Sequence, residues 1–461
     1  MQKYFQKLIK IKFDNRGNIL LFASVFGFIS FSLIVVGVSG YAISENRASN
    51  SKHNRELAFQ VAEAGINYYQ WHLAHNKTDY KDGTGLSGPY VHDYEDKDGN
   101  VIGHFSLNIT SPPVGSSVVL IESTGWIDAQ PNSTRIIKAR IGFPSLTDYA
   151  FLVNTDLWVG DNEVIHGKLH ANGGIRFDGI GDAPITSATP TYICKAHHGC
   201  GNQEKPGVWG QGGPEDLWDF PVPWQDFEAV TAKLSEVEDN SAPALGGLNF
   251  SSSGKQGWRL EFLANGTIKA YKVNSTYCYS GKDIGSNKFV SYCVDIKTLG
   301  SPTTYNMPTN GNIFVNDNVW VDGVVNGRAT IGTVTGKSII INGNITYLAK
   351  DGNHVLGLMA EKDVIVPHNS PDVLEIDAAM LAQHGSAKRY YYSGDMKTSI
   401  TTYGAVISAG IPTWSWVSGG GSVTSGYRTT NSTYDANLTY GPPPAFPVGS
   451  SYHLISWELI K

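Results

Sequence analysis

Residues 54–69 read NRELAFQVAEAGINYY and decide the fold of the N-terminal part of the chain. From Asn54 to Leu73 the apolar positions recur at intervals of four and three, which is the spacing of an amphipathic helix. We expect a stripe of larger apolar residues to dock a folded domain. A neighbouring stripe of small residues would let another backbone approach closely. The docking stripe is Leu57, Val61, Ala64 and Tyr68, continued by Trp71, and the small stripe is Ala58, Ala62 and Gly65.

An apolar segment precedes this helix, because residues 17–44 carry no charged side chain. Its centre, Ile19–Ile43, would extend about 37 Å as a helix, enough to cross a bilayer. The flanking cations predict a cytoplasmic N-terminus, with residues 45–461 on the other side of the membrane. A cleaved secretory signal is the competing interpretation, but the apolar core is long for one and no small-x-small site follows it. The cations are Lys3, Lys7, Lys10, Lys12 and Arg16, against the single anion Asp14.

No proline or turn dipeptide separates the apolar segment from the amphipathic one, so the sequence predicts one continuous rod. The stretches RGNILLFASVFGFISFSLIVVG (16–37) and NRELAFQVAEAGINYYQWHL (54–73) together resemble the N-terminus of PilX-type pilus assembly proteins, the minor pilins of type IV systems. The resemblance covers about residues 16–74. It implies a helix that packs on a sheet in its own subunit and beside other pilin helices in a fibre.

The membrane boundary departs from the family pattern. Typical prepilins are cut after a glycine, with Phe or Met next and a glutamate four residues later, whereas Gly17 is followed here by Asn18 and then Phe22. Arg16, Gly17 and Asn18 therefore mark the membrane boundary and a candidate processing site that lacks the buried carboxylate.

The chain after the helix is rich in β-branched residues and turns. Three alternating runs within residues 103–142 predict antiparallel strands, which complete a helix-and-sheet unit over residues 45–147. From residue 148 the strands become shorter and recur roughly every 20 residues, as in a parallel β-solenoid. A β-sandwich is the alternative. The predicted fold class is α+β and mostly β, with these parts: 1–17 basic leader, 18–44 transmembrane helix, 45–147 pilin-like unit, 148–184 and 311–412 solenoid, 185–310 inserted subdomain, and 413–461 flexible loop with a closing strap.

The inserted subdomain holds all four cysteines. An exported chain with an even number of cysteines predicts disulfides, and local pairing of Cys194 with Cys200 and of Cys278 with Cys293 is the simplest of three connectivities. The stretch CKAHHGC also offers a zinc alternative in which His197 and His198 join two cysteines, although adjacent histidines rarely face one ion.

Catalytic signatures are absent from the sequence. It contains no H-E-x-x-H, G-x-S-x-G, C-x-x-C or Walker pattern, so we predict no cofactor and no metal. The acidic run HDYEDKDGN lacks the ligand spacing of a calcium loop and is read as a hairpin turn. A glycan-cleaving enzyme on a signal anchor is the alternative function, since carboxylates recur along the solenoid. The candidates are Asp317, Asp322, Asp351, Asp363 and Asp377.

Binding to a partner is the preferred class of function. The formal net charge of −6 gives no electrostatic case for nucleic acid. Trp414, Trp416 and Tyr427 flank a GGG loop, and we expect them to be exposed and to contact a surface glycan or a partner-cell protein. The alternative is that these aromatic side chains cover the ends of the solenoid. The sequence therefore predicts a membrane-anchored, pilin-like structural or adhesive component of a bacterial surface fibre, assembled with other pilin-like subunits and displayed at the cell surface.

Overall fold

The computed structural model describes residues 15–113, 116–227, 229–418, 422–449 and 452–461. The described chain forms two compact units. Residues 15–110, 121–139 and 456–461 form the first, which we call the helical unit. The described residues within 111–120 and 140–455 form the second unit, which we call the head. The predicted fold class, α+β and mostly β with a long N-terminal helix, is confirmed.

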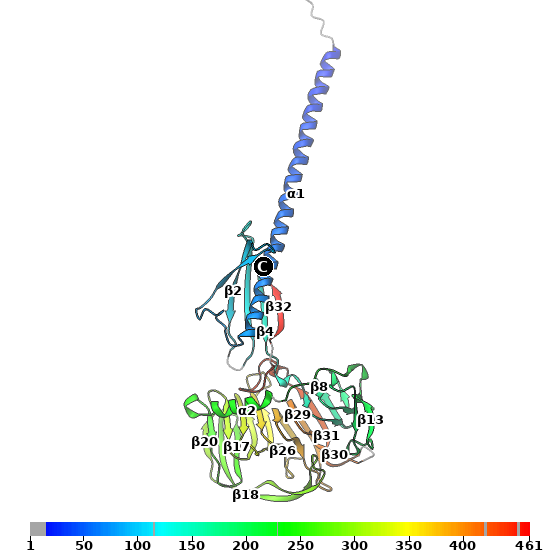
Figure 1. Ribbon diagram of the computed structural model, residues 1–461, viewed down its shortest axis with the longest axis vertical. Coiled ribbons are helices and arrows are strands. Elements are labelled where there is room, and N and C mark those ends of the chain that lie inside the picture. The colour runs from blue at the N-terminus through cyan, green and yellow to red at the C-terminus, as the bar shows by residue number, and fades with distance from the viewer. Residues whose placement is uncertain (1–14, 114–115, 228, 419–421, 450–451) are drawn as a thin grey trace, which may run out of the picture. The chain divides into compact units, whose positions relative to one another are not determined.

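Helix α1 (Asn15–His75) is continuous over 61 residues, as the absence of proline in this stretch predicts (Figure 1). Its N-terminal part lies beyond the sheet of the helical unit, and its large apolar side chains are exposed from Ile19 to Ile43. The described residues contain one helix long and apolar enough to cross a membrane, with a mean hydropathy of 2.6 over its most apolar window. An apolar surface of this length has no partner within the helical unit.

The C-terminal part of α1 packs on a five-stranded sheet ordered β1-β2-β3-β4-β32. The alternation of buried residues along β3 places one face of the strand against the helix, which is the period-2 pattern of a half-buried strand. Strands β1 and β2 are antiparallel and meet at the turn predicted from the acidic run. The strands are β1 (Tyr90–Glu95), β2 (Val101–Thr110), β3 (Val119–Ile127), β4 (Arg135–Gly142) and β32 (His453–Leu459).

The head consists mainly of parallel ladders, in which paired residues are 16–31 positions apart where no antiparallel excursion lies between them. The parallel pairing predicted for this region is confirmed by registers such as Val319 with Ile339 and Ile331 with Leu358. The longest ladder contains β16 (Leu248–Phe250), β21 (Asn312–Val315), β23 (Arg328–Thr333), β25 (Val355–Ala360), β27 (Val373–Ala382), β29 (Met396–Ser408), β5 (Phe151–Val153), β8 (Leu169–Ala171), β11 (Ile185–Ser187) and β15 (Trp218–Asp219).

Three shorter ladders complete the walls of the head. The first joins β17 (Gly257–Leu263), β22 (Val319–Val325), β24 (Ile339–Tyr347), β26 (Val364–Val366) and β28 (Ala387–Arg389). The second joins β29, β31 (Val423–Tyr434), β7 (Glu163–His166) and β10 (Ile180–Gly181). The third joins β6 (Leu157–Val159), β9 (Ile175–Phe177) and β14 (Val208–Trp209). Stacked aliphatic residues that are fully buried fill the space between the ladders.

The spatial order of these strands differs from their order in the chain. Strand β29 pairs in parallel with β5, so Val406 lies beside Phe151 although the two residues are far apart in sequence. Strand β31 likewise pairs with β7. These two pairings join an early segment of the head, residues 151–219, to a later segment, residues 248–434, and we call the junction the seam.

The predicted inserted subdomain at 185–310 is wrong as a single unit, because several of its short strands continue the ladders. Its cysteines lie in two separate excursions. One contains β12 (Thr191–Cys194) and β13 (Gln203–Pro206), and the other contains β18 (Thr267–Lys282), β19 (Phe289–Leu299) and β20 (Thr303–Asn306). A hairpin at Gly266 joins β17 to β18, and the short helix α2 spans Ala229–Asn240.

The C-terminal residues correct the predicted strap at 413–461. Strand β32 is a member of the five-stranded sheet, next to β4, so the head is an insertion between two strands of the helical unit. Residues 442–447 do cover the head as predicted, since Arg328 donates hydrogen bonds to the carbonyls of Gly441 and Pro442, and Thr330 donates to that of Pro444.

Candidate functional site

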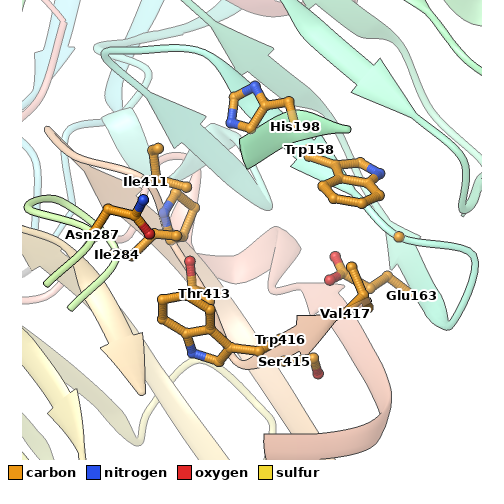
Figure 2. A pocket seen from close by; sticks show the side chains of 12 residues that line it. Trp158, Glu163, His198, Ile284, Asn287, Ile411, Thr413, Ser415, Trp416 and Val417 are labelled. Atoms are coloured by element: carbon orange, nitrogen blue, oxygen red, sulfur yellow. The ribbon is translucent and has the colours of Figure 1, made fainter. Parts of the chain in front are cut away.

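A cavity of about 100 Å³ opens at the seam of the head. Figure 2 shows Trp158 and Trp416 on opposite sides of the space, with Glu163 beside it. Residues from both sides of the seam line the cavity, and we call it the tryptophan pocket. The lining residues are Trp158, Gly160, Glu163, His198, Ile284, Asn287, Ile411, Pro412, Thr413, Ser415, Trp416 and Val417.

Trp158 is held rigidly by its neighbours. It lies on β6 between Leu157 and Val159, which point into the core, so its own side chain points the other way. The indole Nε1 donates a hydrogen bond of 2.9 Å to Asp178, and the guanidinium of Arg176 lies 4.4 Å from the ring centroid. Arg176 also donates to Asp178 at 2.7 Å. The indole N–H is therefore satisfied within the protein, and the ring is fixed before any ligand arrives.

Trp416 is fixed in the same way on the other side. It lies on β30 (Ser415–Val417), which pairs antiparallel with β31. Its Nε1 donates a hydrogen bond of 3.0 Å to the carbonyl of Arg389. Its ring meets Tyr391 edge to face, with 5.8 Å between the centroids. Both indoles thus present apolar ring surface to the pocket and keep their polar edges engaged elsewhere.

The two disulfides each close a loop that contributes to the pocket. The predicted pairs, Cys194–Cys200 and Cys278–Cys293, are both present. The first loop carries His198, whose carbonyl accepts a hydrogen bond of 2.8 Å from Arg176. The second loop carries two more lining residues, Ile284 and Asn287. A crosslink restricts the loop that it closes, so the two disulfides help to hold these walls in place.

Glu163 is the acidic residue that lines the pocket. Its side chain is half-buried at the start of β7. Burial raises the pKa of this carboxyl to about 8, and a hydrogen bond from the Gly160 backbone only partly opposes the effect. At neutral pH the group is therefore mainly protonated, so it can donate one hydrogen bond and accept others.

The predicted ligand-contact aromatics separate into two kinds. Trp416 lines the pocket, but Trp414 is 3% exposed and Tyr427 is fully buried, so the prediction that these two are accessible is wrong. The Tyr427 hydroxyl donates to Ser370, which ties the aromatic ring into the core. Neither Trp158 nor Glu163 stood out in the sequence, because nothing local shows that their strands lie beside residues 411–417.

The carboxylates considered for catalysis form ion pairs or accept backbone hydrogen bonds within the head. Asp317 binds Lys337 at 3.1 Å, Asp322 binds Arg259 at 2.9 Å, and Asp363 binds Lys388 at 3.0 Å. The other two have similar roles, since Asp377 binds Lys350 and accepts from the Tyr347 backbone, while Asp351 accepts from the Asn353 backbone.

The metal alternatives have no support among the described residues. No group of three or more His, Cys, Asp or Glu residues there is placed to hold an ion. Cys194 and Cys200 are joined in a disulfide and so offer no zinc-binding thiolates. Asp96 accepts hydrogen bonds from the backbone of Asp98 and Asn100, as a turn residue does.

The two stripes of α1 are placed differently from the prediction. The small stripe, Ala58, Ala62 and Gly65, faces the sheet of the same chain, since a Cβ on Gly125 of β3 would lie 2.3 Å from the Ala62 nitrogen and one on Gly65 would lie 2.3 Å from Ser123. The docking stripe lies partly to the side: Val61 is buried, Leu57, Ala64 and Tyr68 are half-buried, and Trp71 is 59% exposed.

The small side chains allow the helix to approach the strand backbone closely at this contact. The fully buried face of α1 therefore combines Ala58, Val61, Ala62 and Gly65 with the residues that follow at helical spacing, Ile66, Tyr69 and Leu73. Arg16, Gly17 and Asn18 lie in the first turns of α1, and the leader before Asn15 falls outside the described residues. Whether the chain is processed after Gly17 stays a prediction.

Comparisons with known proteins place the chain only loosely. No family model matches the sequence, and no curated protein matches it. Among solved structures, the competence-associated pilin ComZ from Thermus thermophilus is similar over 88% of this chain and 97% of that chain. The sequence identity is 14% and the TM-score is 0.30, which does not establish a common fold.

Proposed function

We propose that the chain is a membrane-anchored, pilin-like structural and adhesive component of a bacterial surface fibre, which displays its head outside the cell. The observation that carries the proposal is the division of α1 into two parts. One part is apolar on all sides and exposed, and the other part packs against a sheet. The sequence resemblance to PilX-type proteins over about residues 16–74 supports the same role.

The exposed part of α1 has the apolar content of a membrane anchor. Fifteen Leu, Ile, Phe and Val residues lie between Ile19 and Ile43. At about 0.3–0.6 kcal/mol each near the centre of a bilayer, they favour insertion by roughly 5–9 kcal/mol. The cations before the segment favour an N-terminus in the cytoplasm and a head on the far side of the membrane.

The continuity of α1 supports a retained anchor over a cleaved signal. A cut soon after Ile43 would fall inside a helix whose C-terminal part, from Ala58 to Leu73, is buried against the sheet. The small stripe is already covered by that sheet. Other pilin-like subunits would therefore pack against the exposed apolar part of the helix, where Gly27, Gly37 and Gly40 have open space around them.

We further propose that the head binds without catalysis. The five carboxylates that recur along the ladders are engaged in ion pairs or backbone hydrogen bonds, so they serve the fold. A glycosidase needs two carboxyl groups that converge on one substrate bond. In the tryptophan pocket Glu163 is the only Asp or Glu among the described lining residues, which favours a binding site.

The anchoring can be tested with the full chain carrying a C-terminal tag in a bacterial envelope. The double variant Ile29→Arg/Ile34→Arg loses roughly 6–8 kcal/mol of insertion free energy, enough to cancel the roughly 5–9 kcal/mol of the wild type, whereas Ile29→Arg alone loses about half as much. We expect the wild type and the matched control Ile29→Leu/Ile34→Leu to resist carbonate extraction and the double Arg variant to be released.

Protease added to intact spheroplasts gives the orientation in the same cells. Digestion of the tag from outside is expected if the head is displayed. A wild-type chain that carbonate releases into the soluble fraction, or a tag that becomes accessible only after the cells are broken, contradicts the proposal. Recovery of the chain in a sheared surface-fibre fraction would then test its assembly with other subunits.

A further inference from the structure

We propose that the tryptophan pocket binds one uncharged pyranose ring of a glycan, held between Trp158 and Trp416 and hydrogen-bonded by Glu163 and Thr413. The inference gives a ligand class to the adhesive part of the proposed function and rests on that function for its biological use. Binding itself depends only on the head, so it can be measured independently of anchoring and assembly.

The aromatic walls suit the apolar faces of a sugar ring. Both indoles are immobilised before binding, Trp158 by Asp178 and Arg176, and Trp416 by the carbonyl of Arg389. Little conformational entropy is therefore lost when a ring stacks on them. Because both indole N–H groups are already engaged, the tryptophans contribute surface, and hydrogen bonds to hydroxyl groups must come from other residues.

The pocket can admit part of a single ring. An enclosed apolar cavity of about 150 Å³ is known to hold benzene. The tryptophan pocket is smaller, about 100 Å³, but it opens to solvent, so one edge of a six-membered ring can enter while the opposite edge stays outside. The rest of a glycan would then continue outward past the rim, where Asn287 is exposed.

Polar groups lie between the aromatic walls. The Glu163 carboxyl is mainly protonated at neutral pH and can act as donor and acceptor toward a hydroxyl or an acetamido group. The backbone of Thr413 is engaged in a hydrogen bond with Ala387, and its hydroxyl makes no hydrogen bond to another described residue. Ser415 donates its hydroxyl proton to the Tyr427 carbonyl and keeps a lone pair for a ligand.

The charge of the lining selects against ionised ligands. Among the described lining residues there is no lysine or arginine to pair with a uronate or a phosphate. Glu163 and His198 are the titratable side chains of the lining. A cationic amino sugar would have to ionise Glu163 in a site whose burial disfavours the charge. An uncharged hexose or N-acetylhexosamine avoids both costs.

The test uses the full chain in lipid nanodiscs, because a glycoside detergent would compete for the pocket. Methyl β-glucoside, methyl β-galactoside and N-acetylglucosamine are titrated separately at pH 6.5 and followed by tryptophan fluorescence and calorimetry. We expect at least one of them to bind saturably, with a Kd of about 1 mM. Glucuronate and glucosamine are expected to bind at least about tenfold more weakly.

Variants separate the pocket from the rest of the head. Trp416→Ala and Thr413→Val should each weaken binding, the former by about tenfold or more, equivalent to about 1.4 kcal/mol. Trp224→Ala is the matched control, since Trp224 is 56% exposed and does not line the pocket. Glu163→Gln keeps an uncharged hydrogen-bonding group, so it should bind at pH 6.5 and lose the decline in affinity that the wild type shows as the pH passes about 8.

The inference is overturned if none of the three uncharged sugars binds saturably at up to about 50 mM, some fifty times the expected constant. It is equally overturned if Trp224→Ala weakens binding as much as Trp416→Ala in correctly folded protein, or if glucuronate or glucosamine is preferred. Carbonate extraction of the same preparations reports separately on the anchor. Loss of sugar binding with an intact anchor rejects only the ligand assignment, and a released chain that still binds sugar rejects only the anchored role.

Discussion

The contact between α1 and β3 at Gly125 allows a quantitative test of the helical unit. A Cβ placed on Gly125 would lie 2.3 Å from the Ala62 nitrogen and 2.4 Å from the Ala58 oxygen. These are backbone atoms of a helix, so no side chain can rotate away to make room. Because ordinary contacts of a Cβ begin near 3.4 Å, the substitution Gly125→Ala must move the helix away from the strand by about 1 Å.

The displacement loosens the most buried face of the helix. Val61, Ile66, Tyr69 and Leu73 are all at most 3% exposed and lie on that face. A gap of about 0.5–1 Å forfeits a quarter to a half of the attractive contact energy. Overpacked cores typically lose about 1–3 kcal/mol. We expect about 3 kcal/mol here, because the clash is with backbone, and a fall of about 10 °C in the melting temperature of the helical unit.

Scanning calorimetry and far-UV circular dichroism of the full chain in nanodiscs measure the effect. Gly40→Ala is the matched control, since a Cβ there meets nothing within 4 Å and alanine favours the helix. Its melting temperature should not fall. A Gly125→Ala protein that melts within about 2 °C of the wild type would show that α1 does not lie against β3 at this point, and the reasoning from close packing would be wrong.

Three further predictions concern the head. Burial raises the pKa of Glu163 to about 8 from its ordinary value of 4.5, so the folded state holds the proton more tightly than the unfolded state. The free energy of unfolding should therefore decrease as the pH rises from about 5 to about 8. Urea titrations should find this slope in the wild type and a flatter one in Glu163→Gln. Asp395→Asn should destabilise the head by about 3–5 kcal/mol, because Arg389 is fully buried and pairs with Asp395; chemical denaturation monitored by fluorescence measures this loss, and a change below about 1 kcal/mol would contradict it. Cys278→Ser/Cys293→Ser should remove about 3 kcal/mol of stabilisation from the β18–β19 excursion, given the separation of 15 residues; faster amide exchange within residues 278–293, with unchanged exchange in β3, is the expected signature.

The sequence predicts α1 well because the signals for this helix are local. Helical spacing in residues 54–73, an uncharged segment before it and the lack of proline between them all act over a few turns. The same reasoning misassigned the small stripe. The spacing of Ala58, Ala62 and Gly65 shows that a backbone comes close, but it does not show whether that backbone belongs to a second subunit or to β3 of the same chain.

Strand β32 shows what local pattern cannot supply. Apolar and polar residues alternate over 455–459, as in a strand, yet the neighbour of β32 in the sheet is β4, which ends at Gly142. Pairing over such a separation depends on how the entire head folds between the two strands. For the same reason the sequence places four cysteines in one subdomain, whereas the structure distributes them over two excursions from the ladders.

The position of the tryptophan pocket follows from how a stacked head is built. Between the ladders, fully buried aliphatic residues such as Ile331 and Leu358 fill the interior, which leaves little room for a ligand. At the seam, the ladders continue from β29 to β5 and from β31 to β7, so segments that are far apart in the chain lie side by side. Side chains of different shape and polarity meet there, as Trp158 and Glu163 meet Trp416. The residues of the pocket therefore come from segments that are far apart in the chain, and no local pattern in the sequence shows that they meet.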